Sequence, residues 1–454
     1  MNTVIAYFAI VMLLLFVLIK TRNIKSSENE YFVLNKTENT FALTMSFYAS
    51  GMGLWILTSP AEVAWYGLGF DIFGYAISAA TPFILIYVFG PKISNLLPDG
   101  ITLAQFIEKK YGAAAQKIVS LVAVIYMGAF LVAEFASIGF IFNSISGVSG
   151  ILVSSMVAAT TFIYLNKNGF KASFITDKMQ GFGIITLLFV LFILWFSQNN
   201  TSQLIDYAKL GGLTTFETFS FKSALAVIIA VTAAEVFSTG YWQRTFSAKN
   251  NSVIRKASVL SGIGVFVTIL LLGVAGAIGA GKGLSTPSLS FIEQITLTPI
   301  TIFILISLAT LLVTSSVDTL ENAISSTISI DLIKKGAKEA NTITLGVVVL
   351  ALLTSTQVTN IFTVFLFADL LATCLVFPAF YKIKEVRGNL YLVIPFLGSL
   401  LTVVTYRFFF VDLSTNPGGI FIPTDIYGLA DLNTFAVGLI SSVIITFVVD
   451  TIKQ

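Results

Sequence analysis

The segment VTSSVDTLENAISSTISIDL, residues 313–332, places hydroxyl and carboxyl side chains inside an otherwise apolar stretch. Asp318 and Glu321 are spaced to share one face of a helix. Ser315 and Ser316 supply two adjacent hydroxyls, and hard cations such as Na⁺ prefer oxygen ligands of this kind. Serine and threonine in a membrane helix also bond back to the carbonyl four residues earlier. Taken alone, the segment leaves a cation site and a plain helix both open.

A second segment, YASGMGLWILTSPAEVAWYGLG at residues 48–69, predicts an interrupted helix. It holds Gly51, Gly53 and Pro60. Glycine is a poor helix former, and proline removes a backbone donor. A break in the middle of a membrane frees carbonyl groups, which a cation or a solute can satisfy. A simple kink packed against a neighbouring helix is the alternative.

Acidic residues recur inside or at the ends of the apolar stretches. Burying a charge in a bilayer costs at least about 2.5–3.5 kcal/mol, so such residues usually face a cavity or a partner. Basic residues are nearly absent at this depth, and we expect Arg244 and Arg407 to reach outward from span ends. The excess of acids suits a cation path, although protonated acids bonded between helices would also explain it. The acids are Glu62, Glu134, Asp177, Glu235, Asp318, Glu321 and Asp369.

The composition identifies the kind of protein that must position these groups. The chain has 454 residues, is 56% hydrophobic and 11% charged, and has a mean hydropathy of +0.91. A soluble protein of this length needs more charge. One Cys and no His argue against disulfides and against a His-ligated metal or haem. We predict an all-α polytopic membrane protein with about 13 transmembrane helices. The spans lie near residues 2–20, 41–67, 70–90, 114–142, 149–166, 174–197, 221–243, 257–280, 298–333, 342–358, 360–381, 389–410 and 432–450.

The basic residues orient these spans. With the N-terminus outside, about 22 of the 26 Lys and Arg fall in cytoplasmic loops, as positive residues tend to do. We therefore expect a multi-pass protein of the cell membrane with its C-terminus in the cytoplasm. The basic KTRNIK follows the first apolar stretch without a small-residue cleavage site, so that stretch is interpreted as an anchor. The four exceptions are Lys209, Lys222, Lys282 and Arg407.

Four separated phrases resemble the sodium:solute symporter family, which includes sodium-coupled proline, sugar and urea transporters. They are SSENEYFVLNKTENTFALTMSFYASGMG, ITLAQFIEKKYG, NGFKASFITDKMQG and VTSSVDTLENAISSTISIDLIKK. The resemblance covers roughly residues 30–390, in the family's order. A further phrase, FSTGYWQRTFSAKNN, is similar to the urea active transporter branch, whose members carry urea and in some cases polyamines.

The resemblance implies a leucine-transporter-type core of two inverted five-helix repeats. It divides the chain into an N-terminal extra helix and cytoplasmic loop at 1–40, a first repeat at 41–197, an extracellular loop at 198–220, a second repeat at 221–381, and two C-terminal helices at 382–454. The resemblance also implies the ion site: carbonyls of Ala49, Met52 and Leu312 with the hydroxyls of Ser315 and Ser316 would bind Na⁺.

The remaining roles come from the resemblance and from the acids together. Asp177 matches a family aspartate linked to sodium coupling and gating, and Asp318 joins it in that expected role. The sugar-stacking aromatic pair of the family is replaced by Ala234 and Glu235, which argues against sugars. The break lacks the Asp and Ser of proline symporters, which weakens the case for proline. The expected solute-binding residues are Gly51, Gly53, Trp55, Glu62, Glu134, Glu235 and Asp369.

These observations predict sodium-coupled symport of a small polar solute, urea or a small amine, by alternating access. The expected partners are Na⁺, the solute and the lipid bilayer, with a monomeric functional unit, no cofactor and no nucleic acid. A proline-like amino acid or an organic acid symporter, a proton-coupled version and a channel are the alternatives. An enzyme would need a nucleophile–base or metal set, which a chain without His can scarcely build.

Overall fold

The computed structural model describes residues 2–34, 36–358, 361–416 and 418–452, and within these ranges the protein is helical and has no strand. Membrane-length helices are interspersed with shorter ones along the chain. They are α1 (Asn2–Thr21), α2 (Glu28–Phe32), α3 (Thr40–Gly51), η1 (Leu54–Leu57), α4 (Ser59–Leu96), α5 (Leu103–Tyr111), α6 (Ala113–Ser146), α7 (Gly150–Gln198), α8 (Thr201–Leu210), α9 (Thr218–Glu235), α10 (Thr239–Ser247), α11 (Asn251–Gly281), η2 (Pro287–Leu289), α12 (Ser290–Glu293), α13 (Pro299–Thr327), the π-helical η3 (Ile328–Ile333), α14 (Ala337–Ser355), α15 (Ile361–Phe380), α16 (Leu390–Phe410) and α17 (Leu432–Ile452).

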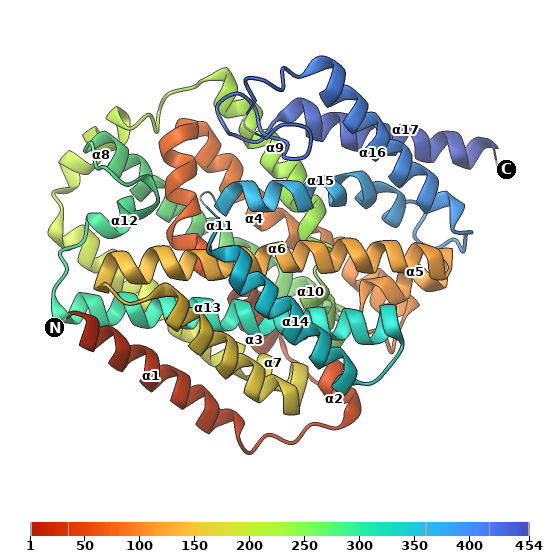
Figure 1. The fold of residues 1–454 in the computed structure, drawn as a ribbon, viewed down its shortest axis with the longest axis horizontal. Helices are drawn as coiled ribbons and strands as arrows, with labels where there is room; N and C mark the ends of the chain where they lie inside the picture. Colours follow the sequence, from red (N-terminus) through yellow and green to blue (C-terminus); the bar gives the residue numbers. More distant parts are fainter. Residues whose placement is uncertain (1, 35, 359–360, 417, 453–454) are drawn as a thin grey trace.

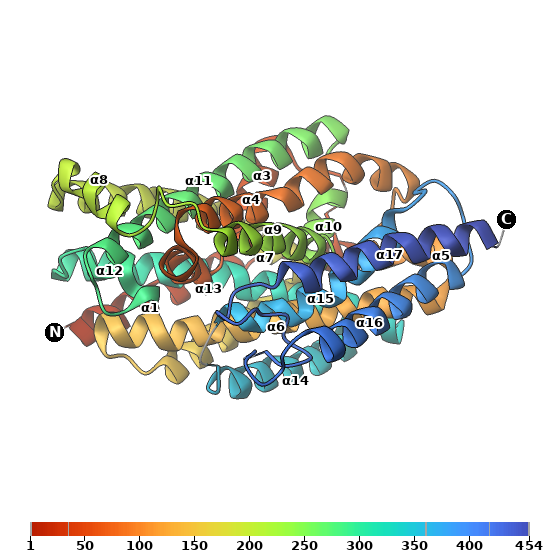
Figure 2. The same ribbon diagram turned by 90° about the horizontal axis from the view of Figure 1, so that it is seen from above.

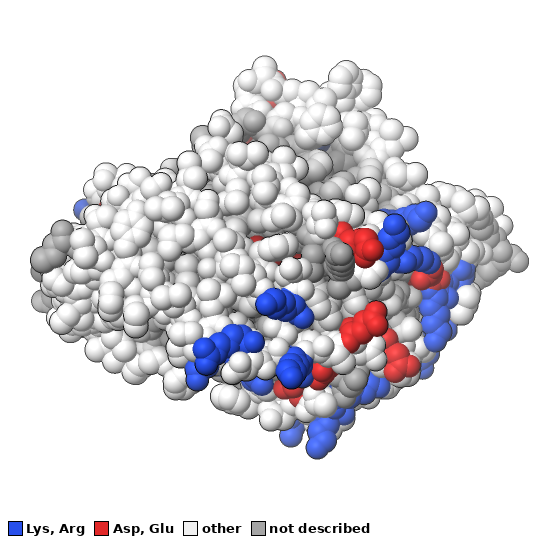
Figure 3. Space-filling model, turned by 60° about the horizontal axis from the view of Figure 1, so that its bottom comes forward, with Lys and Arg blue, Asp and Glu red and all other residues white. Residues whose placement is uncertain are grey.

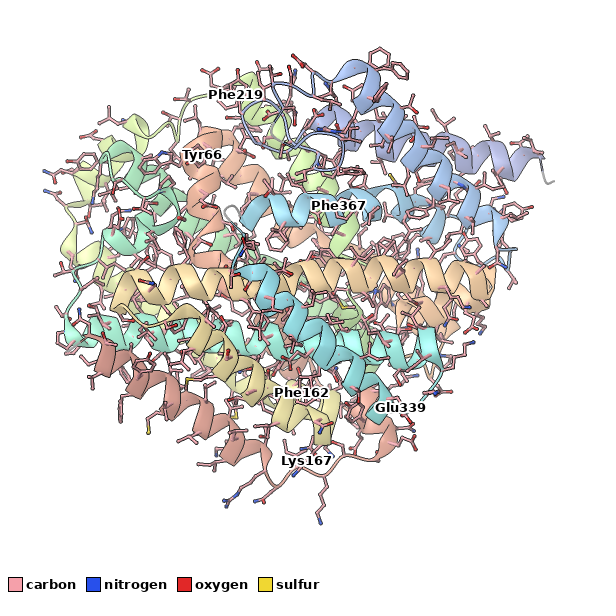
Figure 4. The ribbon with its side chains drawn as sticks, in the orientation of Figure 1. Tyr66, Phe162, Lys167, Phe219, Glu339 and Phe367 are labelled. Atoms are coloured by element: carbon pink, nitrogen blue, oxygen red, sulfur yellow. The ribbon has the colours of Figure 1, made fainter. Side chains whose placement is uncertain are left out.

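The long helices lie side by side and form one bundle (Figures 1 and 2). The short helices α8 and α12 lie at one end of the bundle, and α5 lies at the opposite end. Ten helices among the described residues are long and apolar enough to cross a membrane, and Thr342–Ser355 is a shorter apolar segment. Large apolar side chains such as Tyr66 and Phe367 are exposed on the outside (Figure 4), where lipid would cover them.

The predicted spans map onto these helices once two sharp bends are counted. Helix α4 contains Leu68 at φ 59°, and α7 contains Gly169 at φ 49°. A side chain at Gly169 would place its Cβ 2.3 Å from the backbone oxygen of Tyr31, so only glycine fits there. The α7 bend therefore separates the spans predicted at 149–166 and 174–197. Residue 360, where another span was predicted to begin, lies outside the described residues, as does Met1.

Two membrane helices are interrupted rather than bent. The first break follows α3: Met52 and Gly53 are extended, and α4 begins with Ser59 and Pro60. The sequence predicted this break. The second follows α9, where residues 236–238 separate Glu235 from α10. The sequence predicted one continuous span at 221–243, which is wrong. Breaks in the first helix of each predicted repeat are the arrangement expected at the binding sites of inverted-repeat transporters.

Charged side chains gather on one end of the molecule (Figure 3). Lys167 of α7 points away from the bundle (Figure 4), as the loop prediction requires. Arg244 and Arg407, in contrast, are fully buried, so the expectation that they reach outward is wrong. Arg407 is held by the Thr434 hydroxyl at 2.9 Å. Because buried partners accept its hydrogen bonds, the guanidinium group can remain away from water. The repeat boundaries remain predictions.

Candidate ion and solute sites

Glu134, on α6, fixes the backbone just after the first break. Its Oε2 accepts a hydrogen bond from the Leu54 N–H at 2.9 Å. Its Oε1 is buried and has no hydrogen-bond partner. A Cβ at Gly53 would lie 1.7 Å from this oxygen, so the carboxyl group occupies the space that any larger residue would need. The second glycine of the break therefore lets a carboxyl group approach the chain.

The two predicted hydroxyls on α13 have different environments, although both are fully buried. Ser315 donates to Asp177 Oδ1 at 3.0 Å. The Ser316 oxygen lies beside Glu134 but has no partner in hydrogen-bond geometry. Helix α13 packs against both α3 and η1, so the structure brings Ser316 to the break. Two buried oxygens without a partner in hydrogen-bond geometry thus lie near each other beside the interrupted helix, and leaving a buried polar atom unsatisfied costs about 1–3 kcal/mol.

The other predicted ligands are also close to this place in the fold. Ala49 is in the last turn of α3, and its carbonyl accepts the Met52 N–H at 3.3 Å. Leu312 lies on α13 one turn before Ser316. All three residues are fully buried. The break, the hydroxyl of Ser316 and the carboxyl of Glu134 therefore form one oxygen-rich region, which we name the first-break region.

Asp177 has its charge neutralised by Arg244 of α10 at 2.5 Å, and both side chains are buried. Arg244 also donates to Ser46 of α3 at 2.8 Å and to Thr319 of α13 at 2.8 Å. Ser46 in turn donates to Asp177 at 2.6 Å. This ion pair joins four helices beside both breaks. Sequence reasoning expected Arg244 at a span end, and its burial depends on a partner 67 residues away in the chain.

Asp318 lies in a polar cluster between α13 and α7. It accepts hydrogen bonds from Tyr164 at 2.6 Å, Ser173 at 2.9 Å and Thr176 at 2.9 Å. Thr319 adds a longer contact at 3.3 Å. Because Thr319 also accepts a hydrogen bond from Arg244, it links Asp318 and α7 to the Arg244–Asp177 pair.

A cavity between the two breaks brings together four of the predicted solute-binding residues. The volume in which the centre of a water molecule fits is about 40 Å³. In this conformation the cavity is therefore nearly closed. The hydroxyls of Tyr126 and Tyr241 lie next to Glu235. A smaller cavity extends from Glu235 to Ser316. The predicted residues that line the larger cavity are Gly51, Trp55, Glu235 and Asp369.

The other predicted solute-binding residues lie elsewhere among the described residues. Gly53 and Glu134 belong to the first-break region, and Glu62 lies in the first turn of α4 beside Ser288. Sequence reasoning missed Tyr126 and Tyr241, which contribute the polar aromatic part of the wall. Tyr241 lies in the YWQR phrase, which was the available signal. No comparable signal marks Tyr126 on α6.

Comparison with known proteins supports a transporter fold. No protein-family model matches the chain. It is 26% identical over 260 residues to the spermidine transporter DUR31 of Candida albicans, covering 57% of this chain and 49% of that protein. It is 25% identical over 292 residues to a sodium/proline symporter of Staphylococcus aureus, covering 61% and 54%. The chain thus spans about half the length of the curated relatives it matches. Neither relative is named as a urea transporter.

The structural similarities cover nearly the whole chain. A Na⁺-coupled sialic acid symporter, solved in a substrate-bound outward-open state, matches with a TM-score of 0.77 at 15% identity, over 98% of this chain and 96% of that one. Mhp1, a nucleobase-cation-symport-1 family transporter, matches with a TM-score of 0.60 at 12% identity, over 92% and 93%. These likenesses establish the predicted leucine-transporter-type fold of a multi-pass membrane protein. All four proteins are transporters, in line with the expectation of a non-enzyme.

Proposed function

We propose that the protein is a secondary active transporter that couples the uptake of a small amine-bearing solute to sodium. One observation carries the sodium part. The first break places an interrupted backbone against two buried, unpaired oxygens, Ser316 Oγ and Glu134 Oε1. A bound Na⁺ would satisfy both and would balance the carboxylate charge. Ala49, Met52, Leu312 and Ser315 would complete its shell.

The cavity supports an amine-bearing solute. Two carboxyl groups, Glu235 and Asp369, line it together with the aromatic side chains of Trp55, Tyr126 and Tyr241. Carboxylates attract ammonium groups, and aromatic faces add cation–π attraction of about 0.5–2 kcal/mol. The similarity to a spermidine transporter agrees with this chemistry. Urea, with its N–H donors, is the second candidate, on the strength of the same carboxyl lining.

Alternating access follows from the positions of the two breaks. Sodium bound between α3 and α13 would favour the conformation open to the outside. The solute would then bind in the cavity between the breaks, and rocking of one helix group against the other would release both to the cytoplasm. The membrane potential contributes about 2.3 kcal/mol per charge per 100 mV. The N-terminus would lie outside, the C-terminus in the cytoplasm, and one chain would form the functional unit.

Uptake into liposomes containing the purified protein tests this proposal against its alternatives. Labelled putrescine, spermidine, urea, proline and a small carboxylate would each be offered in sodium or choline medium, with and without a protonophore. We expect sodium-dependent uptake of an amine that resists the protonophore. Uptake abolished by the protonophore and indifferent to sodium would show a proton-coupled transporter. Sodium-dependent uptake of proline or the carboxylate alone would overturn the amine assignment, and flux unaffected by either ion gradient would indicate a channel.

A further inference from the structure

Two carboxyl groups one turn apart on α13 have opposite surroundings. Asp318 lies within hydrogen-bond distance of four hydroxyl groups, of which Thr176 also contacts backbone oxygens of its own helix. Glu321 is 2% exposed, and neither of its side-chain oxygens has a hydrogen-bond partner. Neither the proposed sodium site nor the solute cavity uses Glu321.

The hydroxyl beside Glu321 already has backbone acceptors. Thr161 lies next to Glu321, and its hydroxyl also lies within hydrogen-bond distance of the backbone oxygens of Val157 at 3.0 Å and Ala158 at 3.1 Å. Because a threonine hydroxyl has a single proton, Thr161 can donate to an ionised Glu321 only by giving up these backbone bonds. A protonated Glu321 could instead donate to the Thr161 oxygen while the backbone bond is kept.

Among the side chains that the structure describes, no basic group is placed against Glu321 to compensate a negative charge. The titratable and charged groups around it are Asp318 on its own helix, Tyr164 and Asp177 on α7, and Arg244 on α10. Arg244 is already bound to Asp177 and Thr319. Among the other helices packed on α13, α6 directs Glu134 to the break, and Lys20 of α1 is exposed. An ionised carboxylate without a counter-charge inside a membrane protein is strongly disfavoured. The Glu321 carboxyl group is therefore expected to carry a proton in this conformation.

Helix α7, which covers the pair, bends sharply at Gly169. Tyr164 precedes the α7 bend at Gly169, whereas Ser173 and Thr176 follow it, so the donors of Asp318 come from both halves of α7. Rotation about this bend would separate the two halves and admit water to α13. Glu321 lies between Ser316 and the end of α13 that leads into Lys334 and Lys335. Water would therefore reach it from the basic end, which the distribution of Lys and Arg marks as cytoplasmic.

We propose that Glu321 binds one exchangeable proton, which is held in this conformation and passes to water at the basic end when α7 and α13 separate. The carboxyl O–H bond breaks, water takes the proton, and re-protonation precedes reclosure. This inference rests on the proposed alternating access for the release step, whereas occupancy of Glu321 in the closed state does not depend on it. Acidification of the cytoplasmic side would accordingly slow the opening.

Infrared difference spectroscopy of the purified protein in lipid tests the occupancy without any solute. At pH 7 we expect the wild type to show the carbonyl stretch of a protonated carboxyl group that Glu321→Gln removes, and Glu321→Asp to retain a shifted band. Glu28→Gln, at an exposed glutamate, is the matched control and should remove nothing. Wild-type and Glu321→Gln spectra that coincide in this region would overturn the proposal.

Uptake of labelled putrescine tests the release. We expect the wild-type rate to fall severalfold as the liposome side facing the basic end is acidified, and the Glu321→Gln rate to lose this dependence while its sodium requirement is unchanged. A Glu321→Gln variant with the wild-type pH profile would refute proton exchange. Absence of putrescine uptake by the wild type would instead count against the proposed function, and the infrared result would still decide occupancy.

Discussion

At both breaks a membrane helix is interrupted by a few non-helical residues, but the neighbouring side chains differ. At the second break, Trp242 donates its indole N–H to the freed carbonyl of Val236 at 2.7 Å, so the break is satisfied within its own helix pair. At the first break, Glu134 binds one backbone N–H, and Ser316 and the other Glu134 oxygen remain unpaired. The second break therefore presents Glu235 to a solute cavity, whereas the first leaves oxygens for an ion. The neighbouring helices, rather than the break itself, decide what binds.

The largest expected effect concerns the ion pair that holds both breaks together. Arg244→Met leaves Asp177 as an uncompensated buried charge, which costs about 3–5 kcal/mol. We expect a strongly lowered unfolding temperature in detergent, measured by intrinsic fluorescence. Arg244→Met combined with Asp177→Asn should lose less than Arg244→Met alone.

The partly exposed surface pair of Lys171 with Glu30, at 2.8 Å, is the control for this prediction. Lys171→Met should cost only about 0–1 kcal/mol, because solvent screens a surface pair. Equal losses for Arg244→Met and Lys171→Met would show that the Arg244–Asp177 pair does not join the breaks.

A smaller but specific effect is expected at the first break. Gly53→Ala drives a methyl group into Glu134 Oε1, so Glu134 or the chain must move. We expect sodium-dependent uptake to fall by roughly tenfold or more while the protein remains folded. Gly128→Ala on α6 is the control, since a Cβ there meets no atom within 4 Å. Normal transport by Gly53→Ala would contradict the fixed geometry of the first-break region.

Much of the fold could be predicted from the sequence, because hydropathy and loop charge are local properties. The first break was predicted from Gly51, Gly53 and Pro60. The bend of α7 was predicted as a loop between two spans. The second break has no proline, and its nearest glycine, Gly240, lies within α10, so residue preference gave no signal there.

The site was less predictable because it depends on contacts between distant segments. Ser315 and Ser316 are neighbours in sequence, but only Ser315 meets Asp177, and the different partner of each follows from the packing of α6 and α7 on α13. Glu134 and Glu62 were both predicted to bind solute. The structure puts one at the first break and the other beside Ser288, outside the residues that line the cavity. No single-sequence pattern specifies those pairings.

The smallest expected effect concerns the second break. Glu235→Gln keeps the size of the side chain and removes its charge, so it should weaken recognition of an ammonium group by severalfold. The half-maximal sodium concentration should barely change, because the sodium site is at the other break. Competition of unlabelled putrescine and urea against a labelled amine measures the preference. A change in sodium dependence with unaltered preference would place Glu235 at the ion site instead.

Direct sodium binding to the purified protein tests the central claim, that the first break and α13 together bind the ion. Radioactive sodium would be titrated into wild type, Ser316→Ala and, as a matched control on the same helix, Ser307→Ala. Removing one oxygen ligand should raise the dissociation constant of Ser316→Ala by roughly tenfold, in keeping with a loss of about 1–3 kcal/mol. Ser307→Ala should bind as the wild type does. Wild-type sodium affinity in Ser316→Ala would contradict the account.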